Sequence, residues 1–157
     1  MRKRKTNIVI TKMKSYFFDT SALIKRYHEE KGTDIVDEIF DSDSLIIISS
    51  LSIVESASAL TRKKNEEKLS HEEFENLLRE LFSDILNRIT VISLDDSFLK
   101  DAIGFVIGED LRTLDALQLS FALNTKALKG DIVFVCADKN LVKIAKKKGF
   151  GVINPGE

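Results

Sequence analysis

Short, strongly apolar segments alternate along the chain with longer segments in which apolar residues recur every three or four positions. A short apolar or β-branched run is typical of a buried strand, whereas a recurrence near 3.6 residues indicates an amphipathic helix. The predicted strands are 16–18, 45–48, 91–94, 132–135 and 152–153. The predicted helices are 20–30, 33–40, 50–64, 70–86, 96–107, 113–125 and 140–148.

Strands separated by helices imply crossover connections, and these connections favour parallel strands covered by helices on both faces. We therefore predict an α/β fold with three layers, α/β/α, around a mainly parallel central sheet. In such sheets ligands bind beyond the carboxyl ends of the strands. This rule says where along the chain functional side chains are expected.

The length of 157 residues and the hydrophobic fraction of 43% suit one domain with a substantial core. Residues 1–12 contain five basic residues and no acidic one, so we expect a basic N-terminal tail, disordered and without a specific role, before a single domain at 13–157. An alternative is that this tail contacts nucleic acid. The remaining 19 basic and 25 acidic residues give residues 13–157 a formal charge of about −6. A polyanionic partner would therefore have to be held locally.

A single cysteine, Cys136, excludes an internal disulfide and suits a reducing cytoplasm. No apolar run reaches the roughly 18 residues needed to span a bilayer. We therefore expect a cytoplasmic protein without a membrane partner.

Two aspartates directly follow predicted strands. Asp19 comes after strand 16–18, and Asp138 follows strand 132–135 after two residues. Because the carboxyl ends of parallel strands meet at one edge of the sheet, these carboxylates are expected to be neighbours. The alternative is that each one only caps the helix that follows it, since Asp is a good N-cap residue.

Two further acids, Glu55 and Asp115, lie on predicted helices among apolar and small neighbours. A lone carboxylate on such a face is costly to bury without a partner. Glu55 has an alternative role in a capping box with Ser52. Asp115 has two alternatives: a first-turn acid favoured by the helix dipole, or an ion-pair partner of Arg112.

Considered together, the four acids indicate a metal site. Two like charges 4 Å apart repel by about 1 kcal/mol in water and about 4 kcal/mol at an effective dielectric constant near 20, and a cation would neutralise that repulsion. Oxygen ligands without a nearby His or Cys favour Mg²⁺ or Mn²⁺ over zinc. Phosphate is the usual substrate group at such sites.

Four segments carry a resemblance to PIN domains, in the order and spacing of that family. They are FFDTSALIKRY, SLSIVESASAL, LRTLDALQLSFAL and VFVCADKNLVKIAKKKG, and the resemblance spans Met13 to about Pro155. Cys136 departs from the pattern, because the family often has Thr or Ser two residues before the last Asp. A thiol hydrogen-bonds poorly, so the role of that hydroxyl is expected to be weakened or absent.

The resemblance, and in particular the similarity to VapC-type toxin ribonucleases, implies an Mg²⁺- or Mn²⁺-dependent endoribonuclease that cleaves single-stranded or loop RNA. It implies that four residues are catalytic and bind metal: Asp19, Glu55, Asp115 and Asp138. Thr20 or Ser21 would hold a water or a phosphate oxygen, or would only cap the first helix. Arg112 would contact phosphate or pair with an acid.

The same resemblance implies a cognate antitoxin and a homodimer. The candidates for an apolar groove that binds an antitoxin helix are Leu23, Ile24, Tyr27, Ile35, Ile39 and Leu60, and the alternative is that these residues form core. Two other functions remain open at this point. One is a housekeeping RNA-processing nuclease of the same fold, and the other is a non-catalytic PIN-like module that binds RNA or protein.

Overall fold

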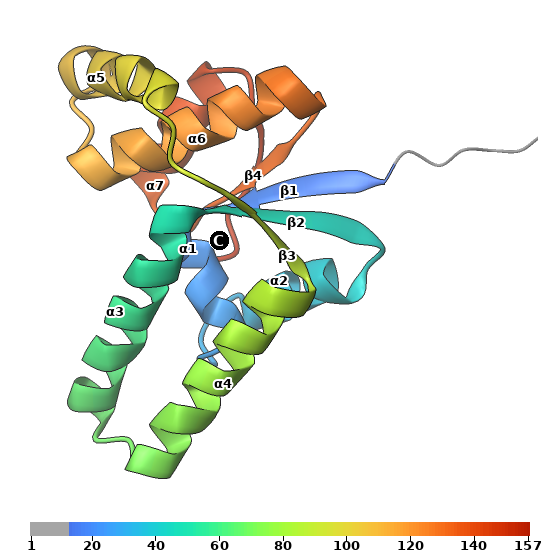
Figure 1. The fold of residues 1–157 in the computed structure, drawn as a ribbon, viewed down its shortest axis with the longest axis vertical. Coiled ribbons are helices and arrows are strands. Elements are labelled where there is room, and N and C mark those ends of the chain that lie inside the picture. Colours follow the sequence, from blue (N-terminus) through green and yellow to red (C-terminus); the bar gives the residue numbers. More distant parts are fainter. Residues whose placement is uncertain (1–12) are drawn as a thin grey trace, which may run out of the picture.

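A five-stranded parallel sheet forms the centre of the protein, in a computed structural model that describes residues 13–157 (Figure 1). The strands are β1 (Lys14–Phe18), β2 (Ser44–Ser49), β3 (Ile89–Ile92), β4 (Val133–Val135) and β5 (Gly151–Ile153). Their order in the sheet is β3-β2-β1-β4-β5, and every neighbouring pair is parallel. The predicted parallel sheet is confirmed. The expectation of a basic tail at 1–12 lies outside the described residues.

Helices cover both faces of this sheet and give three layers. On one face lie α1 (Thr20–Leu23), the 3₁₀ turn η1 (Ile24–Arg26), α2 (Thr33–Asp41), α3 (Ser50–Glu67) and α4 (His71–Asn87). On the other face lie α5 (Ser97–Glu109), α6 (Thr113–Lys129) and α7 (Lys139–Lys147). In Figure 1 these two groups stand below and above the strands. A capping box of Ser70 and Glu73 begins α4.

The alternation of side chains along β1 explains why both faces are covered. Phe17 points into the core shared with α5, α6 and α7, whereas Tyr16 and Phe18 belong to the core under α1–α4. All three rings are less than a tenth exposed. A strand that buries side chains on both faces needs a helical layer on each side, and the predicted α/β/α fold is confirmed.

The prediction of one helix over 20–30 is wrong beyond residue 26. The backbone carbonyl of Lys25, which a continuing α-helix would pair with the amide of residue 29, accepts a hydrogen bond from the Thr33 hydroxyl at 2.8 Å. The buried Lys25 ammonium donates to the carbonyl of Lys31 at 2.9 Å. These contacts turn the chain back on itself before α2. The predicted strand at 91–94 also begins two residues earlier than expected, at Ile89.

The apolar residues considered for an antitoxin groove belong mostly to the core. Five of the six candidates are at most 6% exposed: Leu23, Ile24, Tyr27, Ile39 and Leu60. Ile35 is partly buried against the same core. The structure therefore supports the alternative, in which these positions stabilise the fold. None of the helices in residues 13–157 is both long and apolar enough to cross a membrane.

Candidate functional site

The strand order changes direction at β1, which is the point where parallel sheets of this kind bind ligands. The chain runs outward from β1 to β2 and β3, and then returns to place β4 on the other side of β1. Asp19 follows β1 and Asp138 follows β4. The two aspartates therefore stand at neighbouring strand ends, as the sequence predicts.

Asp19 is the most buried of the four acids, at 6% exposure. It is the N-cap residue of α1, and its Oδ2 accepts hydrogen bonds from the backbone amide of Ser21 at 3.0 Å and from the Ser21 hydroxyl at 2.5 Å. Burial is the main cause that raises the pKa of Asp19, from 3.8 to about 6, and the charges of Glu55 and Asp115 add to this effect. The hydrogen bonds from Ser21 act in the opposite direction.

Glu55 is held by a hydrogen-bond network and not by a capping box. The N-cap of α3 is Ser49, and Glu55 lies in the second turn of that helix. Its Oε2 accepts from the Thr20 hydroxyl at 2.8 Å and from Gln118 Nε2 at 2.6 Å. The alternative capping role for Glu55 with Ser52 is therefore wrong, and the Thr20 hydroxyl positions a carboxylate.

Gln118 is the residue at this site that the sequence analysis missed. It is 1% exposed, and besides Glu55 its Nε2 lies 2.9 Å from Ser52 Oγ, while its Oε1 accepts from Ser49 Oγ at 2.9 Å. The available signal was a polar residue one helical turn after Asp115, between Leu117 and Leu119 in the more apolar half of α6. Its side chain links α6 to the end of β2 and to α3 and fixes the Glu55 carboxylate.

Asp115 lies in the first turn of α6, where the sequence places it. Partial burial is the main cause that raises the pKa of Asp115, and the charges of Asp138 and Glu55 contribute. The positive charge of Arg112 opposes these effects. Arg112 itself is exposed and forms no ion pair with an acid within residues 13–157. It acts on Asp115 only through its charge.

Asp138 is the N-cap of α7, and its Oδ1 accepts from the backbone amide of Leu141 at 2.8 Å. The helix-capping role considered for Asp19 and Asp138 is thus present for both residues, together with their place at the sheet edge. The fully buried Cys136 lies beside this group, with its sulfur 3.6 Å from both Ser21 Oγ and Asp19 Oδ2. Burial raises the pKa of the Cys136 thiol, so this side chain stays neutral.

The four acids line one pocket of about 810 Å³. Two of the acids cap the starts of α1 and α7, and the other two lie on α3 and α6. Thr20 and Ser21 of α1 line the same pocket. We call this hollow the acidic pocket. Val54 and Leu114, the exposed sequence neighbours of Glu55 and Asp115, add an apolar border. Arg62 and Lys63 of α3 extend the pocket along that helix.

The acidic pocket fits a hard divalent cation in the chemistry of its donors. Its carboxylates and hydroxyls offer only oxygen, the ligand type that Mg²⁺ and Mn²⁺ prefer. Every hydrogen bond to the Asp19 carboxylate falls on Oδ2, so Oδ1 has no donor within residues 13–157. In the described conformation, however, no three acidic, His or Cys side chains of residues 13–157 lie close enough to hold one ion. Coordination by three of the acids therefore requires side-chain rotation.

Replacing Gln118 tests the hydrogen-bond network. We predict that Gln118→Met, which preserves the side-chain length, lowers the free energy of unfolding by about 1–3 kcal/mol, because buried hydroxyl and carboxylate groups lose their partner. Asn87→Met at an exposed position of α4 is the matched control and should change stability by less than about 0.5 kcal/mol. Urea unfolding measures both values. Equal stability of the two variants would contradict the network.

The raised pKa of Asp19 predicts a pH-dependent stability in metal-free buffer. Between pH 3.8 and about 6 the folded state binds more protons than the unfolded state, so stability falls as the pH rises through this window. The shift corresponds to about 3 kcal/mol at most. Asp19→Asn removes this cost, so its stability relative to the wild type should increase from pH 4 to pH 7 in urea unfolding. A difference that stays constant with pH would contradict the burial argument.

Comparison with known proteins supports the architecture. The family model of the PIN domain matches residues 16–147. No sequence among curated proteins matches the chain. Similar solved structures include a toxin–antitoxin complex from Klebsiella pneumoniae, with a TM-score of 0.60 and 16% identity over 89% of this chain and 97% of the other. PAE2754 from Pyrobaculum aerophilum has a TM-score of 0.59 and 21% identity, and the similarity covers 90% of each chain.

A third similar structure is VapBC2 from Rickettsia felis bound to a DNA fragment from their promoter. It has a TM-score of 0.60 and 16% identity, over 89% of this chain and 98% of the other. At these identities the solved structures show a shared fold. The family model covers most of the chain and matches the segments that contain all four acids, so this chain belongs to the PIN domain family.

Proposed function

We propose that the chain is a divalent-metal-dependent endoribonuclease that cleaves single-stranded or loop RNA, and that it is the toxin of a toxin–antitoxin pair. The observation that carries the nuclease proposal is the acidic pocket, where carboxylates from four elements gather at the carboxyl ends of the strands. A binding module has no need for neighbouring carboxylates whose charges help to raise the pKa values of Asp19 and Asp115. A metal ion would neutralise this charge and attract phosphate.

Asp19, Glu55 and Asp115 are the proposed metal ligands, and Asp138 contributes directly or through water. When bound, Mg²⁺ or Mn²⁺ would supply Lewis acidity, which makes a water more nucleophilic and neutralises charge that develops on the phosphoryl group. In-line attack on phosphorus with the 3′ oxygen as leaving group would give 5′-phosphate and 3′-hydroxyl ends.

The neighbouring polar groups of the chain orient these carboxylates. The Ser21 hydroxyl donates to Asp19, and the Thr20 hydroxyl and the Gln118 amide donate to Glu55. Each of these carboxylates keeps one oxygen that accepts no hydrogen bond within residues 13–157. Arg112 is exposed at the start of α6 and carries a charge that a substrate phosphate can use.

Partners are proposed by similarity. The solved structures with this fold include a toxin–antitoxin complex and VapBC2 with promoter DNA. We therefore expect a cognate antitoxin, and the sequence resemblance adds the expectation of a homodimer. The apolar border of the acidic pocket, formed by the 71% exposed Val54 and the 48% exposed Leu114, is a suitable contact for a bound chain. We propose this border as the antitoxin contact, in place of the apolar groove expected from the sequence.

A cleavage assay tests the enzyme. Purified full-length chain, free of inhibitor, should cut an unstructured RNA with Mg²⁺ or Mn²⁺ but not with EDTA. Asp115→Asn should lower the rate at least about 100-fold, equivalent to about 2.7 kcal/mol of barrier. The matched control is Asp131→Asn, an exposed acid near the opposite end of β4, which should cleave at the wild-type rate.

The same variants test the toxin assignment. Expression of the wild type and of Asp131→Asn should stop cell growth, whereas Asp115→Asn should be tolerated. Absence of cleavage on every RNA with either metal would refute the nuclease. If the wild type cleaves RNA but does not affect growth, the nuclease proposal holds and the toxin assignment is refuted.

A further inference from the structure

Three lysines form a line along the exposed face of α7. Lys139, Lys143 and Lys146 are spaced by four and three residues, so they lie on the same side of the helix. All three are exposed, and the opposite side of α7 is buried through Leu141, Val142, Ile144 and Ala145. We call these three residues the lysine row.

The lysine row has no acidic partner within residues 13–157. The next two lysines, Lys147 and Lys148, both pair with Glu109, at 2.9 and 2.8 Å, but no carboxylate lies within 4 Å of the row. Among the described helices of nine or more residues, α7 alone contains no Asp or Glu. In a chain whose formal net charge is −1, this is a local concentration of positive charge.

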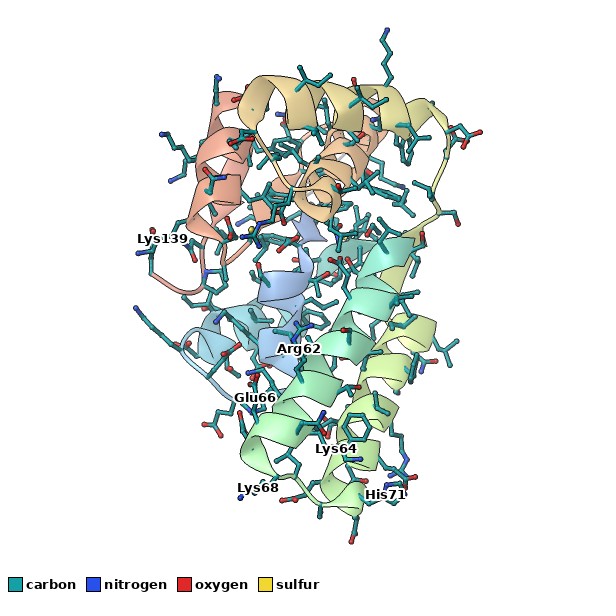
Figure 2. All side chains as sticks on the ribbon, turned by 90° about the vertical axis from the view of Figure 1, so that its left-hand side faces the viewer. Arg62, Lys64, Glu66, Lys68, His71 and Lys139 are labelled. Carbon is teal, nitrogen blue, oxygen red and sulfur yellow. The ribbon has the colours of Figure 1, made fainter. Side chains whose placement is uncertain are left out.

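The lysine row begins at the acidic pocket. Lys139 is the residue directly after Asp138, whose side chain lines that pocket. Arg62, which lines the pocket from α3, donates to the Ser58 hydroxyl and forms no ion pair within the described chain. Figure 2 looks onto this side of the molecule and shows Arg62 on α3 and Lys139 at the start of α7.

Local helix electrostatics do not explain the lysine row. A positive charge is favourable in the last turn of a helix and unfavourable in the first. This accounts for Lys146 but not for Lys139, which is the first residue of α7. The row instead complements a polyanion. From Lys139 to Lys146 it extends about 10 Å along the helix axis, close to the length of about three nucleotides of a stacked strand.

We propose that the lysine row holds the sugar–phosphate backbone of single-stranded RNA on the α7 side of the acidic pocket. This inference rests on the proposed ribonuclease function and adds a path for the substrate. The acids of the pocket repel the RNA until their charge is neutralised, and the lysines supply attraction immediately beside them. Because contacts to phosphate carry no sequence information, the lysine row would hold RNA without regard to sequence.

Binding of a fluorescein-labelled oligouridylate of twelve nucleotides in EDTA tests the proposal by fluorescence anisotropy, without cleavage. The variant replaces Lys139, Lys143 and Lys146 by Gln. The matched control replaces Lys31, Lys100 and Lys129 by Gln, so both proteins lose three positive charges. These three control lysines are also exposed and form no ion pair in the described residues. Thermal unfolding checks that both remain folded.

The lysine-row variant should bind RNA at least about tenfold more weakly than the wild type, and its slope of log affinity against log salt should be smaller by about 2, at about 0.7 for each lost phosphate contact. The control should stay within about twofold of the wild type. Equal affinities of the two variants would overturn the proposal and assign the lysines to another partner, such as an acidic protein segment.

The ribonuclease proposal and the lysine-row proposal can be refuted separately. If the wild type cleaves RNA and the lysine-row variant binds RNA as well as the wild type does, the proposed RNA contact of the lysine row is wrong. The proposed ribonuclease function is then unaffected. If the wild type neither binds nor cleaves RNA, the ribonuclease itself is refuted and the path with it.

Discussion

Burial of carboxylates close to one another beside the carboxyl ends of β1 and β4 is the constraint around which this protein is built. Asp19 is buried and its pKa is raised to about 6, so its ionisation at neutral pH destabilises the folded state. The charges of Glu55 and Asp115 increase this cost, and hydrogen bonds from Ser21 reduce it. A cation bound among these acids would offset this cost, so under the proposed function metal binding would also stabilise the fold.

The parallel sheet makes this arrangement possible. Because β1 lies between β2 and β4, the segments that follow these three strands meet at one edge. Asp19 and Asp138 begin the helices that leave the sheet there, and both also cap those helices. Gln118 then ties the helix that bears Asp115 to the helix that bears Glu55. The site is therefore fixed by the core as much as by its own residues.

Patterns local in sequence predicted much of this structure. Short apolar runs and helical periodicity located the strands and helices, and the rule about strand ends located Asp19 and Asp138. Contacts between distant residues could not be predicted in this way. Gln118 meets Glu55 across 63 positions, and the end of the first helix depends on Thr33 reaching the carbonyl of Lys25. The groove expectation failed for a related reason, since periodicity marks an apolar face without showing what covers it.

Direct metal binding tests the central claim. Isothermal titration of the full-length chain with Mn²⁺ at pH 7 should show binding in the wild type and in Asp131→Asn. Asp19→Asn should bind at least about tenfold more weakly, because it removes a ligand charge. Wild-type affinity should also fall below pH 6, where Asp19 gains a proton. Absence of Mn²⁺ binding, or equal binding by the wild type and Asp19→Asn, would contradict a metal centre in the acidic pocket.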